Sequence, residues 1–205
     1  MAREKGSEKR QRILEAALKV FAERGFYNAK VSEVARVAGV ADGTIYLYFE
    51  NKDDLLIQLF EDRMEYIIRR LQDELERTPG DPLERIRRLI HLHVDLALHD
   101  PDLAEFITVE LRQSSKFVKE YENPQFLEYL RVLRDIVEEG QRGGFIRPGL
   151  DSRLIVRAIF GALDEVLLTL TLASRSRSVD VAMSADQLAD LLIDGMSTPE
   201  TRLHS

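Results

Sequence analysis

The sequence reads VSEVARVAGVADGTIYLYF from Val31 to Phe49, and this stretch predicts two short helices joined by a tight turn. Small apolar residues recur from Val31 at i, i+3, i+4 and i+7, on one side of a first helix for which Ser32 is the expected N-cap. Gly39 ends this helix, because glycine readily adopts the left-handed conformation. A second helix is expected over 43–49. This order is typical of a helix-turn-helix unit.

The second helix should turn Ile45 and Phe49 toward the core and leave hydroxyl and apolar side chains outward. Such a face suits a DNA major groove, where hydroxyls reach phosphates and apolar groups contact thymine methyl groups. An apolar helical stripe from Leu14 to Phe21 supplies a third helix. A three-helix cluster without a nucleic-acid role is the alternative. We predict phosphate contacts from Lys30, Tyr46, Tyr48 and Lys52, base-edge contacts from Ala41, Gly43, Thr44 and Leu47, and further DNA contacts from Val31, Ser32 and Asp42.

Charge is segregated along the chain. Residues 1–52 hold 10 Lys and Arg against 7 Asp and Glu, while residues 53–205 hold 19 against 29, so the net charges are +3 and −10. Binding to phosphates needs cations, so the N-terminal part can bind DNA while the acidic remainder repels it. The basic run from Arg3 to Arg12 is expected either as an arm on the DNA or as a disordered start.

The length of 205 residues and the hydrophobic content of 44% allow a second core. We therefore predict two domains, a DNA-binding domain over 1–52 and an effector-binding and dimerisation domain over 53–205. The sequence contains no cysteine, and no secretory or transmembrane apolar run is evident. These features predict a cytoplasmic protein without disulfides.

Helical periodicity continues to the end of the chain, and the predicted fold class is all-α. Asn51-Lys52-Asp53-Asp54 resembles a capping box, and proline in a first turn favours two further helix starts. The expected helices run from about Lys52 to a stop at Thr78-Pro79-Gly80, from Pro82 to His99, from Pro101 until the apolar pattern is lost at Arg112, from about Pro124 to Arg142, from Ser152 to about Ser174, and from Ser184 to Met196, with fraying from Thr198 onward.

Several short patches resemble the DNA-binding domain of the TetR family. They are Gly25-Phe26, Val34-Ala35, Ala38-Gly39-Val40, the run 43–49 and Asn51-Lys52-Asp53-Asp54-Leu55. The resemblance implies a three-helix DNA-binding domain followed by a helical ligand-binding and dimerisation domain. It also implies a homodimer on a palindromic operator, because two recognition helices about 34–36 Å apart can enter successive major grooves.

The helix from Ser152 contains the most apolar run of the chain, over 158–173. It is too short for a membrane span and too apolar for a surface helix. The TetR resemblance implies that the last two helices pair with those of a second chain around a twofold axis. The alternative is that they fill the core of a monomer. The predicted dimer-interface residues are Ala158, Gly161, Ala162, Leu188, Leu191 and Leu192.

A ligand site between helices is expected to be apolar, with a few polar groups at its mouth. No carboxylate cluster lies among the apolar candidates, which favours a long neutral ligand part over a cationic drug. Cations at Lys119, Arg85, Arg87 and Arg88 would also suit phosphates at the mouth. The predicted ligand-binding residues are Phe60, Met64, Leu89, Leu103, Phe106, Ile107, Arg112, Lys116, Phe126, Leu130, Phe160 and Leu163.

Three patches sharpen the resemblance to the acyl-CoA-responsive fatty-acid-degradation repressors of the family, the FadR type. They are the run 39–49, Glu110-Leu111-Arg112-Gln113-Ser114, and Phe160-Gly161 followed by Asp164-Glu165. The resemblance implies a repressor that long-chain acyl-CoA releases from its operator. Two alternatives stay open: a repressor of an efflux or other metabolic operon that senses another hydrophobic molecule, and an acyl-CoA carrier whose DNA-binding segment is vestigial.

The sequence does not favour an enzyme, a cofactor or a metal site. His91 and His93 are two residues apart and so point to different sides of a helix, as a core or boundary histidine and a surface one. Asp164 and Glu165 are adjacent, about 100° apart on a helix, and do not form an acid–base pair by themselves. No Walker lysine, nucleophile elbow or zincin motif is present.

Overall fold

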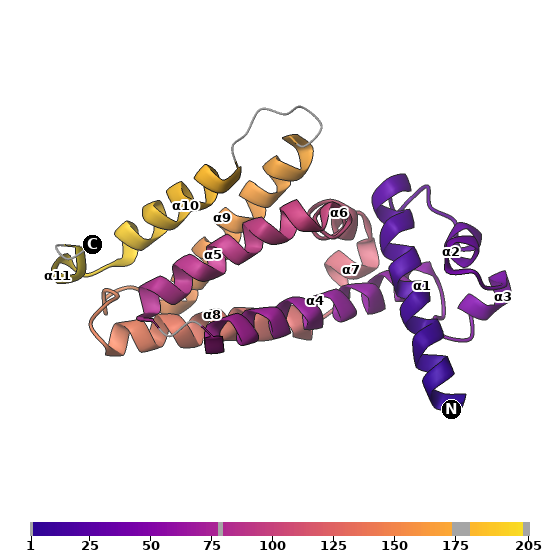
Figure 1. Ribbon diagram of the computed structural model, residues 1–205, viewed down its shortest axis with the longest axis horizontal. Helices are drawn as coiled ribbons and strands as arrows, with labels where there is room; N and C mark the ends of the chain where they lie inside the picture. Colours follow the sequence, from indigo (N-terminus) through magenta and orange to yellow (C-terminus); the bar gives the residue numbers. More distant parts are fainter. Residues whose placement is uncertain (1, 78–79, 174–180, 203–205) are drawn as a thin grey trace. The chain divides into compact units, whose positions relative to one another are not determined.

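The computed structural model describes residues 2–77, 80–173 and 181–202. These segments are helical without any β-strand, apart from one isolated bridge between Ile146 and Ser197, so the all-α prediction is confirmed. The elements, labelled in Figure 1 where there is room, are α1 (Ala2–Arg24), α2 (Val31–Ala38), α3 (Asp42–Ile45), α4 (Lys52–Arg77), α5 (Pro82–His99), α6 (Pro101–Thr108), the 3₁₀ helix η1 (Glu110–Gln113), α7 (Ser115–Lys119), α8 (Pro124–Arg142), α9 (Ser152–Ala173), α10 (Val181–Met196) and α11 (Pro199–Arg202).

Side chains cap the helices where the sequence predicted starts. The Asn51 amide oxygen accepts the Asp54 N–H at 2.9 Å, and the Asp54 carboxylate accepts the Glu50 N–H at 2.8 Å, one residue before the predicted partner. Asp81 accepts from Leu83 at 2.8 Å. These bonds satisfy the N–H groups that lack partners inside a helix, which explains why the starts could be predicted from local sequence.

Two predictions for the helix-turn-helix were wrong in detail. Ser32 is not the N-cap, because α2 begins at Val31 and the Glu33 carboxylate reaches back to accept the Lys30 N–H at 3.0 Å. The second helix is shorter than 43–49. The N–H groups of residues 48 and 49 both donate to the Ile45 carbonyl at 3.0 Å, and this shared acceptor tightens the turn after α3.

Two further differences concern segments that were expected to be irregular. Beyond α6, η1 and α7 continue the chain, and the Ser114 hydroxyl accepts the Phe117 N–H at 3.1 Å to cap α7. The end of the chain is ordered past Thr198, which donates its N–H to the Phe145 carbonyl at 3.0 Å and precedes α11. Residues 174–180 and 203–205 lie outside the described residues, and α10 begins at Val181 rather than at the predicted Ser184.

The chain forms two compact units by contact. The first comprises residues 1–63 and 100–122, and the second comprises residues 64–99 and 123–205. The segment 100–122 thus packs with the N-terminal helices although it follows α5 in sequence. The predicted functional division at residue 52 stays a prediction.

The first unit is built on the apolar stripes of α1, α2 and α3. Phe21, Val34, Ile45 and Phe49 are at most 2% exposed, as the helical spacing predicted. α1 packs against α2, which follows it after a short connection, and against α6, which is distant in sequence. The core therefore holds the helix-turn-helix in place mainly by burial of apolar surface.

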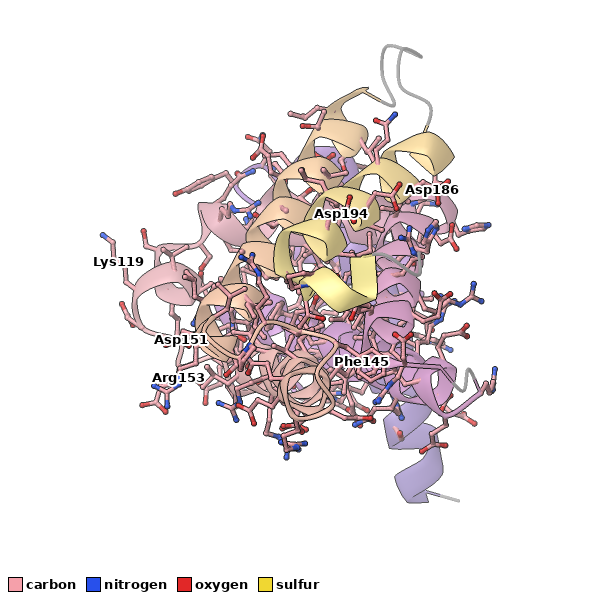
Figure 2. All side chains as sticks on the ribbon, turned by 90° about the vertical axis from the view of Figure 1, so that its left-hand side faces the viewer. Lys119, Phe145, Asp151, Arg153, Asp186 and Asp194 are labelled. Atoms are coloured by element: carbon pink, nitrogen blue, oxygen red, sulfur yellow. The ribbon has the colours of Figure 1, made fainter. Side chains whose placement is uncertain are left out.

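The second unit packs α5 against α8, α9 and α10. A Cβ at Gly140 would lie 2.6 Å from the Ile146 side chain, so a larger residue there would force that side chain to shift. α10 carries acidic side chains that include Asp186 and Asp194 (Figure 2). No helix within the described residues is both long and apolar enough to cross a membrane.

A histidine–tyrosine pair is buried inside the second unit. The Tyr129 hydroxyl lies 2.9 Å from His93 Nε2, and His93 Nδ1 lies 2.8 Å from the Leu89 carbonyl. The carbonyl requires a proton on Nδ1, so Nε2 accepts from the tyrosine. Burial lowers the pKa of His93 and raises that of Tyr129. His91 is half-buried and lies 3.1 Å from Asp186, as predicted for a boundary or surface histidine.

The His93 pair predicts a loss of stability in mild acid. The unfolded chain takes up a proton below the ordinary histidine pKa of 6.5, whereas the folded chain resists it because its pKa is lower. The free energy of unfolding should therefore fall by up to ~1.4 kcal/mol per pH unit as the pH drops below 6.5. Urea unfolding at several pH values would measure it, and a His93→Gln variant with an unchanged slope would contradict it.

Candidate DNA-binding surface and effector region

α3 and the turn after it present an exposed face. Leu47 is 81% exposed and Tyr46 57%, whereas Thr44 and Tyr48 are half-buried. Ala41, Asp42 and Gly43 are also exposed at the start of the helix. The groove contacts predicted for this face would cover the exposed leucine and tyrosine side chains.

The start of α2 forms the neighbouring part of the predicted surface. Lys30 and Ser32 are exposed, and Val31 is half-buried. The Lys30 backbone N–H is used by Glu33, while its side chain faces solvent. The ammonium group is thus accessible to a phosphate, and the helix N-terminus beside it favours an anion.

Lys52 lies at the start of α4 and is tied into the first unit. Its Nζ donates to the Ala29 carbonyl at 2.8 Å and to the Tyr27 carbonyl at 3.2 Å, and it lies 4.5 Å from the centre of the Phe26 ring. Burial lowers the pKa of Lys52, and the charge of Asp53 opposes that shift. Since an ammonium group has three N–H donors, one remains for the predicted phosphate contact.

The basic N-terminal run is part of α1 rather than an extended arm. The Arg10 guanidinium donates to Gln58 Oε1 at 2.8 Å, and that of Arg12 donates to the Ala38 carbonyl at 3.1 Å. These contacts fasten α1 to α4 and to the end of α2. The two arginines therefore support the helix-turn-helix as well as adding positive charge.

A buried carboxylate of η1, which the sequence reasoning did not assign to a site, contacts the turn between α1 and α2. Glu110 is 4% exposed and accepts the backbone N–H of Phe26. Burial raises its pKa, and the hydrogen bond from Phe26 opposes that shift. The available signal was one glutamate between the apolar residues Val109 and Leu111, but spacing alone could not name its partner.

The predicted ligand-binding residues divide between the two units. Half of them are buried, Arg112 is exposed, and Ile107, Lys116, Phe126, Leu130 and Phe160 are half-buried. The first unit holds Phe60, Leu103, Phe106, Ile107, Arg112 and Lys116, and the second holds Met64, Leu89, Phe126, Leu130, Phe160 and Leu163.

Aromatic side chains gather between α8 and α9 in the second unit. The Phe126 and Phe160 rings lie 4.7 Å apart edge to face, and Tyr129 lies 6.1 Å from Phe160. Phe126 and Phe160 are only half-buried, so this cluster keeps apolar surface that further apolar groups could cover. A small cavity of ≈ 10 Å³ lies nearby, where Ile67 on α4 faces His93 on α5.

The predicted cations differ in their surroundings. Arg85, Arg87 and Arg88 each contact a carboxylate, Glu139 at 2.6 Å, Asp190 at 2.7 Å and Glu74 at 2.5 Å. Each of these three arginines is thus engaged with a carboxylate of the second unit, and the suggestion that they bind a ligand's phosphates stays a prediction. Lys116 is half-buried on α7, and Lys119 points into solvent (Figure 2).

The predicted dimer residues include an exposed face on α9 and α10. Ala158 and Gly161 are exposed, Ala162 and Leu192 are half-buried, and Leu191 is 72% exposed. A Cβ at Gly161 would meet no atom of its own chain within 4 Å. Leu188 does not belong to this face. It is only 9% exposed, because it points into the core of its own unit.

No metal centre is formed by the described residues. Within 2–77, 80–173 and 181–202, no three histidine, aspartate or glutamate side chains are grouped so that they could hold an ion.

Comparison with known proteins covers nearly the whole chain. Residues 13–59 match the family model for bacterial regulatory proteins of the tetR family, and residues 60–195 match that for the C-terminal region of YsiA-like proteins. The fatty acid metabolism regulator protein of Bacillus subtilis is 37% identical over 188 residues, which cover 92% of this chain and 95% of that protein.

Solved structures are similar over the same length. The crystal structure of the transcriptional regulator FadR from Bacillus subtilis in complex with stearoyl-CoA has a TM-score of 0.83 at 37% identity and covers 90% of this chain and 98% of that one. FadR from Bacillus halodurans has a TM-score of 0.82 at 34% identity, with the same coverage. The family models account for both the helix-turn-helix and the helical remainder, and the chain is a transcriptional regulator of the TetR family.

Proposed function

We propose that the protein is a dimeric repressor of fatty-acid degradation genes that long-chain acyl-CoA releases from its operator. The observation that carries the proposal is the 37% identity, over 92% of the chain, with a fatty acid metabolism regulator. The FadR protein from Bacillus subtilis, whose solved structure is 37% identical in sequence to this chain, was crystallised with stearoyl-CoA. The role requires chromosomal DNA, so we propose a cytoplasmic protein.

The exposed face of α3 supports the proposed DNA contacts. Tyr46 and Leu47 project from the turn that follows α3, directly after Ile45, which is 1% exposed and packed in the core. A rigid backing allows a short helix to present its outer side chains to the groove in one orientation. Lys30 and Lys52 would bind phosphates beside it and fix the register without reading sequence.

The half-buried aromatic cluster supports an apolar effector. Phe126, Leu130 and Phe160 would pack against an acyl chain, which carries no charge for a buried carboxylate to neutralise. The phosphates of CoA would need cations, and Arg112 and Lys116 on η1 and α7 are our candidates. The ligand would release DNA only if it binds the released state more tightly than the operator-bound state.

α4 is the proposed lever between ligand and DNA. It runs without a break from Lys52, which contacts the α1–α2 turn, into the second unit at Met64. A displacement of the second half of a continuous helix is transmitted to its first turn. A coupling of ~1–3 kcal/mol corresponds to about a 5- to 150-fold change in operator affinity.

The test is a titration of operator binding with acyl-CoA esters of increasing chain length. The operator would first be selected from random duplex DNA with the purified protein. We expect stearoyl-CoA to weaken binding about 5- to 150-fold, and free CoA and stearate to act weakly. An acyl-CoA that binds but leaves operator affinity unchanged at every length would overturn the inducer role. Release by an unrelated hydrophobic drug alone would favour the other regulator class.

A further inference from the structure

The turn between α1 and α2 leaves one backbone donor without a helical acceptor. Gly25 adopts φ +76° and donates its N–H to the Phe21 carbonyl at 2.9 Å, which is the single bond of a left-handed helix end. The Ala29 N–H donates to the Gly25 carbonyl at 3.0 Å and closes the turn. Phe26 follows Gly25, is 6% exposed, and must find an acceptor for its N–H elsewhere.

The acceptor comes from residue 110, 84 positions along the chain. The Glu110 carboxylate accepts the Phe26 N–H, and the Gln113 amide donates to the same oxygen at 3.0 Å. A Cβ at Gly25 would lie 3.7 Å from this oxygen, so the backbone of the turn runs directly past the carboxylate. The glutamate is held from two sides and has little freedom to move away.

Lys52 binds the carbonyl groups of the same turn, those of Tyr27 and Ala29. The turn is therefore held by an anion on its N–H side and by a cation on its C=O side. Hydrogen bonds to charged partners are stronger than those between neutral groups. Since α2 begins two residues after the turn, the position of the turn sets the position of the helix-turn-helix.

We infer that Glu110 is a positioning residue for DNA binding: it latches the α1–α2 turn to η1 and so fixes the helix-turn-helix for the operator. η1 lies in the segment 100–122, which joins α5 at one end and α8 at the other, and both of these helices belong to the second unit. A displacement of α5 or α8 would thus be delivered to the turn through Glu110. The expected effect of a ligand on this Glu110 contact is the only part of the inference that rests on the proposed function.

Two conservative substitutions separate the role of the acceptor from that of the charge. Glu110→Gln keeps the reach and an acceptor oxygen but loses the charge, whereas Glu110→Asp keeps the charge but shortens the side chain by one methylene. We expect Glu110→Asp to speed amide hydrogen exchange at Phe26 roughly tenfold or more, and to weaken operator binding about tenfold, since a buried donor loses its partner. Glu110→Gln should stay within about threefold of wild type in both.

The matched control is Glu120→Gln, which removes an exposed carboxylate of the same segment and should change neither quantity. Both measurements are made on the full-length protein at a temperature where every variant is folded, so a loss of stability alone would not change operator affinity. Unchanged exchange and affinity in Glu110→Asp would overturn the latch. Damage in Glu110→Gln together with an unaffected Glu110→Asp would overturn it too, because charge rather than the reach of the acceptor would then matter.

The last measurement repeats the hydrogen-exchange experiment with stearoyl-CoA. Its addition to the wild-type protein should speed exchange at Phe26, and unchanged exchange despite binding would overturn the ligand response of the latch. Failure of stearoyl-CoA to bind would overturn the proposed effector instead. The results for the ligand-free variants would stand in either case.

Discussion

Replacing Gly161 by leucine is expected to convert the proposed dimer into a monomer and to weaken operator binding by about 100-fold or more, because a monomer loses the gain from binding two half-sites together. Gly161 is exposed on α9, and a Cβ there meets nothing in its own chain within 4 Å. The leucine would therefore leave the protomer intact and separate the two α9 helices. Small residues at a helix crossing set how closely two backbones approach.

Sedimentation and operator titration would measure both effects. Gly149→Leu is the matched control, because Gly149 is also exposed with open space around its Cβ, but it lies in the loop before α9. Leu191→Gln tests the same face from α10, where a 72% exposed leucine gains from being covered by a partner. A Gly161→Leu protein that remains dimeric and binds the operator normally would place the interface elsewhere.

Replacing Lys52 by alanine is expected to weaken operator and random DNA alike, by more than a single lost phosphate contact would. The ammonium group holds the carbonyl groups of Tyr27 and Ala29, so its loss also loosens the turn before α2. The phosphate contribution should lower the slope of log affinity against log salt by about one unit for each protomer bound. The loosened turn should lower the affinity for DNA further without changing the salt slope.

Lys30→Ala is the control for Lys52→Ala. It removes the same charge from an exposed side chain at the start of α2. Filter binding at several salt concentrations should give similar slope changes for the two variants but a larger loss of affinity for Lys52→Ala. Equal losses would mean that the turn does not depend on Lys52, and an altered sequence preference would mean that Lys52 reads bases rather than phosphates.

Local sequence predicted most of the helices, because their ends depend on neighbouring residues. Asn51 and Asp81 cap α4 and α5 from within one turn. The spacing of apolar residues correctly predicted that Ile45 and Phe49 are buried and that Tyr46 is exposed. The start of α2 was misplaced although its cap is local: Lys30 is the N-cap, and the Glu33 carboxylate accepts its N–H from within one turn.

The candidate site was predicted less completely than the fold. Periodicity identifies which side of a helix is apolar, but it does not say which apolar residues fill their own core. Leu188 is therefore buried although it shares the helical spacing of Leu191. Likewise, the charge of Arg85 was visible in the sequence, whereas its carboxylate partner Glu139 lies 54 residues away.

The sequence by itself determined the helix-turn-helix, the all-α class and the segregation of charge, since each depends on residue type and short-range spacing. Only the tertiary structure decided that residues 100–122 pack with the N-terminal helices. It also decided that Glu110 and Lys52 both hydrogen-bond to the backbone of the α1–α2 turn, Glu110 to an N–H group and Lys52 to carbonyl groups. The physical reason is that a buried N–H or carbonyl group demands a partner without specifying where in the chain it lies. Packing of the helices brings that partner within hydrogen-bonding distance, and no local sequence pattern indicates which residue it will be.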